Sequence, residues 1–180
     1  SNQPINRFNV ISKNNNIENQ NKIDLISNLK DQISSIENCN LKNNSKNLVM
    51  GDGDINSPIV LIGETPGKIE DSSGLAFQGD VGSLLKKMLL AINIKIEKVY
   101  LTYSINFRPP EDRKPTAQEI KRYSVFLKKH ISIINPKIII LMGSTAMEAL
   151  TGSTSRISSE RGKWKEIKLK NKTFPFLTTF

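Results

Sequence analysis

The sequence has few of the residues that build disulfides, metal sites and membrane spans. It contains one cysteine, Cys39, among 180 residues, which excludes an internal disulfide and a metal site built from the cysteines of one chain. Its one histidine, His130, lies within a predicted helix and is interpreted as structural. No apolar run approaches the roughly 20 residues that cross a membrane, and no secretion signal is recognisable near the N-terminus. We therefore expect a cytoplasmic monomer that does not bind membranes.

The charge balance is strongly basic. Lysine and arginine number 26 against 17 acidic residues, which gives a net charge of +9 and a pI near 9.7. A basic surface favours polyanionic partners, nucleic acid first. The alternative is that lysine merely solvates the surface of a chain rich in asparagine, isoleucine and lysine, and charge alone leaves both interpretations open.

The chain divides into a tail and one domain. Residues 1–20 are rich in asparagine, poor in apolar side chains and without period, which predicts a disordered tail. Residues 21–180 form the predicted α/β domain. It opens with a helix over 22–36, because Ile26, Leu29, Ile33 and Ile36 recur at helical spacing. A polar stretch follows over 38–56.

Strands and helices then alternate. Continuous apolar runs at 59–62, 99–103, 138–142 and 174–180 predict buried strands. Between them, apolar residues at 81–92 follow the helical period, a capping box at Thr116 and Glu119 opens a helix that runs to 134, and a third helix covers 144–150. This alternation predicts a three-layer α/β/α fold around a central four-stranded parallel sheet. Ligands bind such sheets where loops leave the carboxyl ends of the strands.

The loop after the first strand carries the densest group of functional residue types. It reads Gly63-Glu64-Thr65-Pro66-Gly67, followed by Glu70 and Asp71. Glycine and proline make a tight turn whose backbone amides can approach a ligand closely. The alternatives are an ordinary strand-to-helix turn with solvated acids, or a phosphate cradle. The acids and the lack of a following Gly-Lys-Ser/Thr argue against the cradle.

Two further loops add positive charge. Arg108, Arg113 and Lys114 follow the second strand, and Arg161 and Lys163 precede Trp164. Guanidinium and ammonium groups in loops at this edge are suited to backbone phosphates. An ordinary charged surface is the alternative interpretation for both loops.

Taken in order, these motifs resemble the signature of the uracil-DNA glycosylase superfamily, and most closely its bacterial and archaeal iron–sulfur (family 4) type. The resemblance covers roughly residues 22–180. It rests on Gly63-Glu-Thr-Pro-Gly67, Glu70-Asp71, Gly74-x-x-Phe77-x-Gly79, Gly82-x-Leu-Leu85, Arg108-Pro-Pro110, Arg113-x-Pro115 and Arg161-Gly-x-Trp164.

The resemblance implies a bacterial, nucleoid-associated enzyme of DNA base-excision repair. Such enzymes flip uracil out of single- or double-stranded DNA and hydrolyse its N-glycosidic bond. Glu70 would orient water or counter positive charge on the sugar, with Glu64 as a second catalytic acid. The base would contact Gly63 and the backbone at Glu64 and Thr65, stack on Phe77 and meet Tyr103. DNA phosphates would be bound by Arg108, Arg113, Lys114, Arg161 and Lys163.

The chain departs from this family at its iron–sulfur cluster. Of the four positions that carry cysteine ligands in the family, Cys39 alone is cysteine, and the others are Ile36, Phe107 and Tyr123. A four-iron cluster needs four ligands. We therefore predict no cluster, no other metal and no cofactor, with apolar packing in its place, as in a cluster-less branch of the family.

Three other departures concern activity. Tyr103 stands where the family has a uracil-reading asparagine, and Thr65 where it has a small residue. The family's His-Pro motif, whose histidine stabilises the departing uracil anion, would begin just past Phe180, so we expect the C-terminal end of the domain to be missing from this sequence. These departures leave two alternatives: a catalytically weakened or inactive DNA-binding homologue, or a glycosylase for another base such as hypoxanthine.

Overall fold

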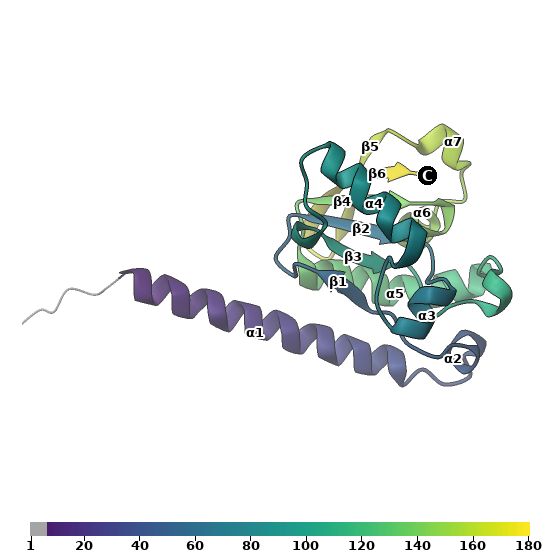
Figure 1. Cartoon of the computed structure of the whole chain (residues 1–180), viewed down its shortest axis with the longest axis horizontal. Coiled ribbons are helices and arrows are strands. Elements are labelled where there is room, and N and C mark those ends of the chain that lie inside the picture. Colours follow the sequence, from purple (N-terminus) through teal and green to yellow (C-terminus); the bar gives the residue numbers. More distant parts are fainter. Residues whose placement is uncertain (1–6) are drawn as a thin grey trace, which may run out of the picture.

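Six strands and seven α-helices make up the described part of the chain, residues 7–180 of a computed structural model, with side chains described from residue 15 (Figure 1). The helices are α1 (Arg7–Ser34), α2 (Asn40–Asn44), α3 (Lys68–Ser73), α4 (Gly79–Ala91), α5 (Ala117–Ile134), α6 (Ser144–Thr151) and α7 (Ile157–Glu160), with 3-10 turns η1 (Ile96–Lys98) and η2 (Pro110–Asp112). The strands are β1 (Gly51–Gly53), β2 (Ile59–Gly63), β3 (Tyr100–Tyr103), β4 (Ile138–Met142), β5 (Trp164–Leu169) and β6 (Lys172–Thr179).

The strands form one mixed sheet in the order β1-β3-β2-β4-β6-β5. The four inner strands pair in parallel, and β1 and β5 pair antiparallel at the two edges. The prediction of a four-stranded parallel sheet is therefore wrong in strand number and in the character of the whole sheet. The inner strands were recognisable because burial on both faces requires continuous apolar runs. The edge strands are short or exposed and lack such runs, so the sequence did not reveal them.

Alternate residues of the inner strands face two different helical layers. Val60 and Ile62 of β2 belong to the core cluster that contains residues of α1, α5 and α6. Leu61 belongs to the second cluster, with Leu85 and Leu89 of α4. Helices therefore cover both faces of the sheet, and Figure 1 shows α4 on its near side. This arrangement is the mixed α/β architecture that the alternation of elements predicts.

Helix α1 is longer than the sequence suggested. Its second half packs against the domain through Leu29 and Ile33, both buried, while its N-terminal turns extend away from the other elements (Figure 1). Residues 7–20 of the predicted disordered tail are part of α1, residues 1–6 lie outside the described part, and the disorder of the tail stays a prediction. The chain has no glycine or proline between residues 5 and 50, so nothing breaks the helix on the N-terminal side of its packed half. The domain boundary at residue 21 stays a prediction.

Helices α4 and α5 confirm the helical periods read from the sequence, with one difference. In α5, the Thr116 hydroxyl accepts a bond from the Glu119 amide and the Glu119 carboxylate accepts one from the Thr116 amide, so the capping box is present. In α4, Leu85 and Leu89 are buried, but Val81, Leu84 and Met88 are 66%, 59% and 60% exposed. No helix in the described part of the chain is long and apolar enough to span a bilayer.

Candidate active site

A cavity of about 450 Å³ opens at the carboxyl ends of β2, β3, β4 and β6. All six residues that were predicted to act in catalysis or base binding line it, although they come from separate segments. Its lining from the segment 63–77 and from β3 comprises Gly63, Glu64, Thr65, Gly67, Glu70, Phe77 and Tyr103. The remainder, from α4, β4 and the end of β6, is Val81, Leu84, Leu85, Met88, Met142, Thr179 and Phe180.

Gly63 is required by the close approach of two aromatic rings. A Cβ atom at this position would lie 2.9 Å from Cζ of Phe77 and 3.0 Å from Cδ1 of Tyr103. Such distances are shorter than carbon–carbon contact, near 3.5–4.0 Å. The last residue of β2 must therefore be glycine for both rings to reach the cavity wall.

Phe77 and Tyr103 form a stacked pair. Their ring centroids are 4.7 Å apart and the rings are inclined by 13°, and the Tyr103 hydroxyl accepts a bond of 3.0 Å from the Phe77 amide. Phe77 has φ of 50°, a left-handed conformation that few bulky residues adopt. Burial raises the pKa of Tyr103, so its hydroxyl stays protonated. One face of Phe77, the predicted stacking surface, is thus covered by Tyr103.

The Glu64 carboxylate is held at the start of α6. Its Oε1 accepts a bond of 2.8 Å from the Thr145 amide, where the helix dipole favours negative charge. The approach is tight, since a Cβ on Gly143 would lie 2.4 Å from Cδ of Glu64. The Glu64 backbone oxygen accepts a bond of 2.6 Å from the Ser104 hydroxyl. Glu64 therefore joins the turn after β2 to α6 and to the loop after β3.

Glu70 is buried, and its carboxylate binds both ends of the segment 67–78, which carries Phe77. Its Oε2 accepts a bond of 3.1 Å from the Gly67 amide, and its Oε1 one of 2.9 Å from the Gln78 amide. Each carboxylate oxygen has a second lone pair, so a water molecule could still bind on the cavity side. Glu70 lines the cavity and its two backbone bonds give it a structural role, while its catalytic role stays a prediction.

Two buried polar residues near the site, Asp71 and Asn106, were not among the site residues predicted from the sequence. Asp71 accepts bonds of 2.8 and 3.2 Å from the amides of Lys46 and Asn47, which fixes the segment before β1 to α3. Asn106 donates a bond of 3.0 Å to the Val49 backbone oxygen and does not line the cavity. Asp71 stood next to Glu70 in the motif, but nothing in the sequence indicated its partners.

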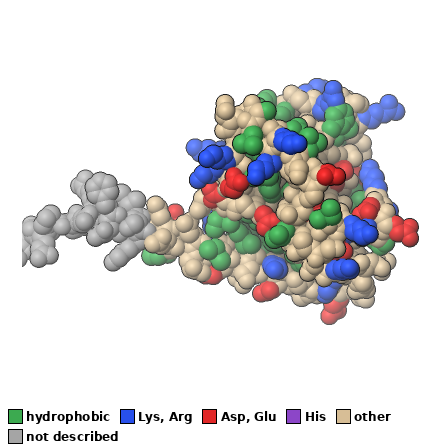
Figure 2. Space-filling view, viewed as in Figure 1, with side chains coloured by type: hydrophobic (Ala, Val, Ile, Leu, Met, Phe, Trp, Pro, Cys, Tyr) green, Lys and Arg blue, Asp and Glu red, His purple; other side chains and the backbone are tan. Residues whose placement is uncertain are grey.

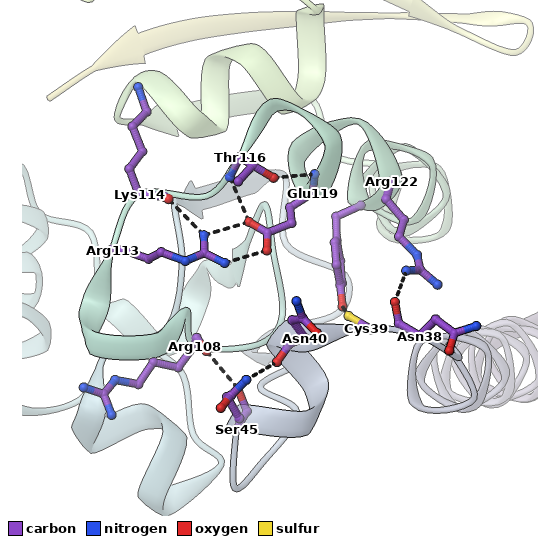
Figure 3. A network of polar contacts seen from close by, with 12 residues as sticks. Asn38, Cys39, Asn40, Ser45, Arg108, Arg113, Lys114, Thr116, Glu119 and Arg122 are labelled. Carbon is purple, nitrogen blue, oxygen red and sulfur yellow. Dashed lines mark hydrogen bonds and ion pairs between the residues drawn. The ribbon is translucent and has the colours of Figure 1, made fainter.

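The residues predicted to bind phosphates differ in their contacts with neighbouring side chains. Arg108 and Arg113 form ion pairs of 2.7 Å with Asp112 and Glu119, and Figure 3 shows the second pair. The hydrogen bond from Arg108 lowers the pKa of Asp112. In contrast, Lys114 and Lys163 are exposed. The Arg161 guanidinium lies 4.3 Å from the centroid of Phe180, which lines the cavity.

The four positions that correspond to the family's cluster ligands come together in the structure. The Cys39 sulfur lies 3.3 Å from the Tyr123 hydroxyl, Phe107 packs edge-on against Tyr123, and Ile36 belongs to the same core cluster. Figure 3 shows Cys39 beside the bond from Arg122 to the Asn38 backbone. One thiol among an aliphatic, a phenyl and a phenol side chain does not fit a four-iron cluster. Among the described residues, no group of three or more histidine, cysteine or acidic side chains could hold a metal ion.

His130 is fully buried away from the cavity. Its Nε2 lies 2.8 Å from the Tyr100 hydroxyl, and burial lowers its pKa to about 4. The imidazole is therefore neutral at physiological pH. These contacts support the structural interpretation of the only histidine in the chain.

Comparisons with known proteins identify relatives of this chain. The family model described as the uracil-DNA glycosylase superfamily matches residues 50–179. A Type-4 uracil-DNA glycosylase of Thermotoga maritima is 38% identical over 125 residues, which cover 69% of this chain and 65% of the relative. Type-4 uracil-DNA glycosylases of Archaeoglobus fulgidus and Sulfurisphaera tokodaii are 34% and 32% identical, over 76% and 88% of this chain and 70% and 74% of their own lengths.

The aligned region thus spans about two thirds to three quarters of these relatives. The family match covers both the turn after β2 and the carboxyl end of β6, which are the segments that bound the cavity. By sequence, this chain belongs to the uracil-DNA glycosylase superfamily.

Proposed function

We propose that this protein is a DNA base-excision repair glycosylase that hydrolyses the N-glycosidic bond of uracil flipped out of DNA. The observation that carries the proposal is the cavity between the Gly63–Thr65 turn and Phe77, in a chain of this superfamily. An enzyme that cuts this bond must take the nucleotide out of the base stack into such a pocket.

In the proposed reaction, the bond between the base and C1′ of the sugar breaks, the base leaves with the electron pair, and water supplies the hydroxyl at C1′ and the proton that neutralises the base. Departure of the base leaves positive charge on the sugar, which a fixed carboxylate stabilises. We assign this role to Glu70, because its backbone bonds hold the charge in place without occupying every lone pair. Glu64 acts by positioning, since its carboxylate is bound to the amide of Thr145.

We propose that the reaction uses no cofactor, because water is the nucleophile and a fixed carboxylate stabilises the charge on the sugar. The packing of Cys39 and Tyr123 supports a cluster-free enzyme. The proposed partner is uracil-containing DNA, single- or double-stranded, bound by a cytoplasmic, nucleoid-associated monomer of net charge +9. Lys114, Arg161 and Lys163 are the cations best placed for phosphates, because Arg108 and Arg113 are already paired.

A second candidate function follows from Tyr103. Its ring covers one face of Phe77 at a centroid distance of 4.7 Å, and a phenol offers one donor and acceptor group where an amide offers both a donor and an acceptor. The site could therefore bind damaged or abasic DNA without excision, or accept a base other than uracil, such as hypoxanthine.

The discriminating experiment measures release of free base from DNA that contains uracil opposite guanine, from single-stranded DNA with uracil, and from matched substrates with hypoxanthine. Wild type is compared with Glu70→Gln and Tyr103→Asn. Uracil release that falls strongly in Glu70→Gln, with DNA binding retained, supports the proposed function. Binding of abasic DNA without release of any base, at every enzyme excess, supports the second candidate and rejects the first.

A further inference from the structure

Three successive backbone amides hold the segment that carries Phe77, and each donates to a side chain from a different element. The bonds join Ala76 to Asp52 of β1 at 2.5 Å, Phe77 to Tyr103 of β3 at 3.0 Å and Gln78 to Glu70 of α3 at 2.9 Å. Two successive peptide planes define φ and ψ of the residue between them. Three fixed planes therefore set the backbone torsions of both Ala76 and Phe77.

Strand β1 directs Asp52 toward this segment. Asp52 lies opposite Leu101 of β3, and residues directly opposite on paired strands point to the same face. Leu101 belongs to the core cluster that contains Phe77. A Cβ on Gly53 would lie 2.1 Å from the Val99 backbone oxygen, so glycine after Asp52 lets this edge strand approach β3 closely. The short strand β1 thus places a carboxylate on the side of the sheet where Phe77 lies.

A solvated surface acid is the alternative interpretation of Asp52. Figure 2 shows acidic side chains among lysine, arginine and hydrophobic groups on the face of the molecule that carries α4. Asp52 is instead half-buried, and its carboxylate is bonded to the Ala76 amide. Burial, together with the charges of Glu70 and Asp52, raises the pKa of Tyr103, which indicates that both carboxylates lie near its hydroxyl. The contacts of Asp52 are therefore those of a residue built into the segment.

The conformation of Phe77 needs such support. Its φ of 50° lies in the left-handed region, which bulky residues rarely adopt and which persists only where the surrounding structure holds it. Tyr103 stacks on one face of the Phe77 ring, so a base in the cavity can stack only on the other face. A small rotation of the segment would turn that face away from the position of the base.

We propose that Asp52 is a positioning residue, whose bond to the Ala76 amide fixes the Phe77 ring for stacking on a base flipped into the cavity. Phe77 lines the cavity and Asp52 does not, so Asp52 acts through Phe77 and does not touch the base. The inference rests on the proposed function, because Phe77 is a stacking surface only for such a base.

Hydrogen exchange of backbone amides, followed by NMR, tests the positioning without any substrate. Amides exchange when the structure opens locally. In Asp52→Ala, the amides of Phe77 and Gln78 should exchange at least about tenfold faster, although their own acceptors are unchanged, because a bond to a charged group is lost from the segment. Asp54→Ala is the matched control, since the Asp54 carboxylate accepts a bond from the Asn56 amide. Exchange at Phe77 and Gln78 that stays at the wild-type rate would overturn the proposal.

A double-mutant cycle on uracil release from single-stranded DNA tests the effect on the base. Asp52→Ala should lower kcat/KM about tenfold in wild type. In Phe77→Ala it should lower kcat/KM less than about twofold, because the ring that Asp52 positions is gone. Asp52→Asn keeps an oxygen that can accept the bond and should stay within about threefold of wild type. If Asp52→Ala does not fold, both experiments use Asp52→Asn, whose smaller loss should also disappear in Phe77→Ala.

The outcomes separate positioning from a general structural role. Equal losses in wild type and in Phe77→Ala would overturn the proposal, and so would an Asp52→Asn variant as impaired as Asp52→Ala. A wild type that releases no base at any enzyme excess would instead reject the proposed function. The exchange of the Phe77 amide would then decide by itself whether Asp52 fixes the segment.

Discussion

Acidification should destabilise this protein through His130, and the size of the effect follows from its burial. Its pKa falls from about 6.5 in the unfolded chain to about 4 in the folded protein. The unfolded state therefore binds more protons between these values, so stability is lost as pH falls through this window and the loss levels off below about pH 4. At 1.36 kcal/mol per pKa unit, the full effect is roughly 3 kcal/mol, of which about 2 kcal/mol is lost between pH 7 and pH 5.

Urea unfolding at pH 7 and pH 5 measures the effect, with wild type compared with His130→Gln. Glutamine can still bond to the Tyr100 hydroxyl, which lies 2.8 Å from the imidazole, but it does not titrate. The other titrating groups contribute equally to both proteins, so the difference between the two pH dependences isolates His130. A variant whose stability falls as steeply as wild type between pH 7 and pH 5 would refute the reasoning.

Three further outcomes are expected. Gly143→Ala should lower the free energy of unfolding by about 2 kcal/mol or more, because φ is 104° and the new Cβ would lie 2.4 Å from Glu64. Gly152→Ala is the control and should cost only about 1 kcal/mol, since φ is 74° and the new Cβ would enter open space. Equal losses of the two variants in urea unfolding would contradict this account. Protein purified without oxygen should contain no stoichiometric iron by colorimetric assay, and about four iron atoms per chain would contradict the cluster-free proposal. DNA affinity should fall steeply with salt, and Arg161→Gln should reduce the slope by about 1, whereas Arg113→Gln should leave it nearly unchanged because that guanidinium is paired.

The sequence revealed those parts of the fold that depend on residues close together in the chain. Burial on both faces makes β2 and β4 continuous apolar runs, and the cap of α5 needs only Thr116 and Glu119. Edge strands carry no such requirement, and β5 mixes charged and apolar residues without strict alternation, a pattern that a loop also permits. The sequence could not show which side of α4 is buried, because the helical period identifies an apolar face but not the element that packs against it.

The candidate site was predictable in its membership and not in its contacts. Gly63, Glu70 and Phe77 converge because the turn and the start of α4 follow one another in the motif. The stacking of Tyr103 on Phe77 joins residues 26 positions apart, and the attachment of Glu64 to Thr145 joins residues 81 apart. Such contacts depend on sheet order and side-chain direction, which composition and spacing do not specify.

The attachment of Glu64 to α6 has a consequence for distant substitutions. Because the turn that forms the cavity floor is bonded to the first turn of α6, any change that rotates or shifts that helix also displaces the floor. Ala146 and Ala149 are completely buried on α6, so a larger side chain at either position would push the helix away from its packing. Variation at these two alanines would then alter ligand affinity in the cavity, although neither residue lines it.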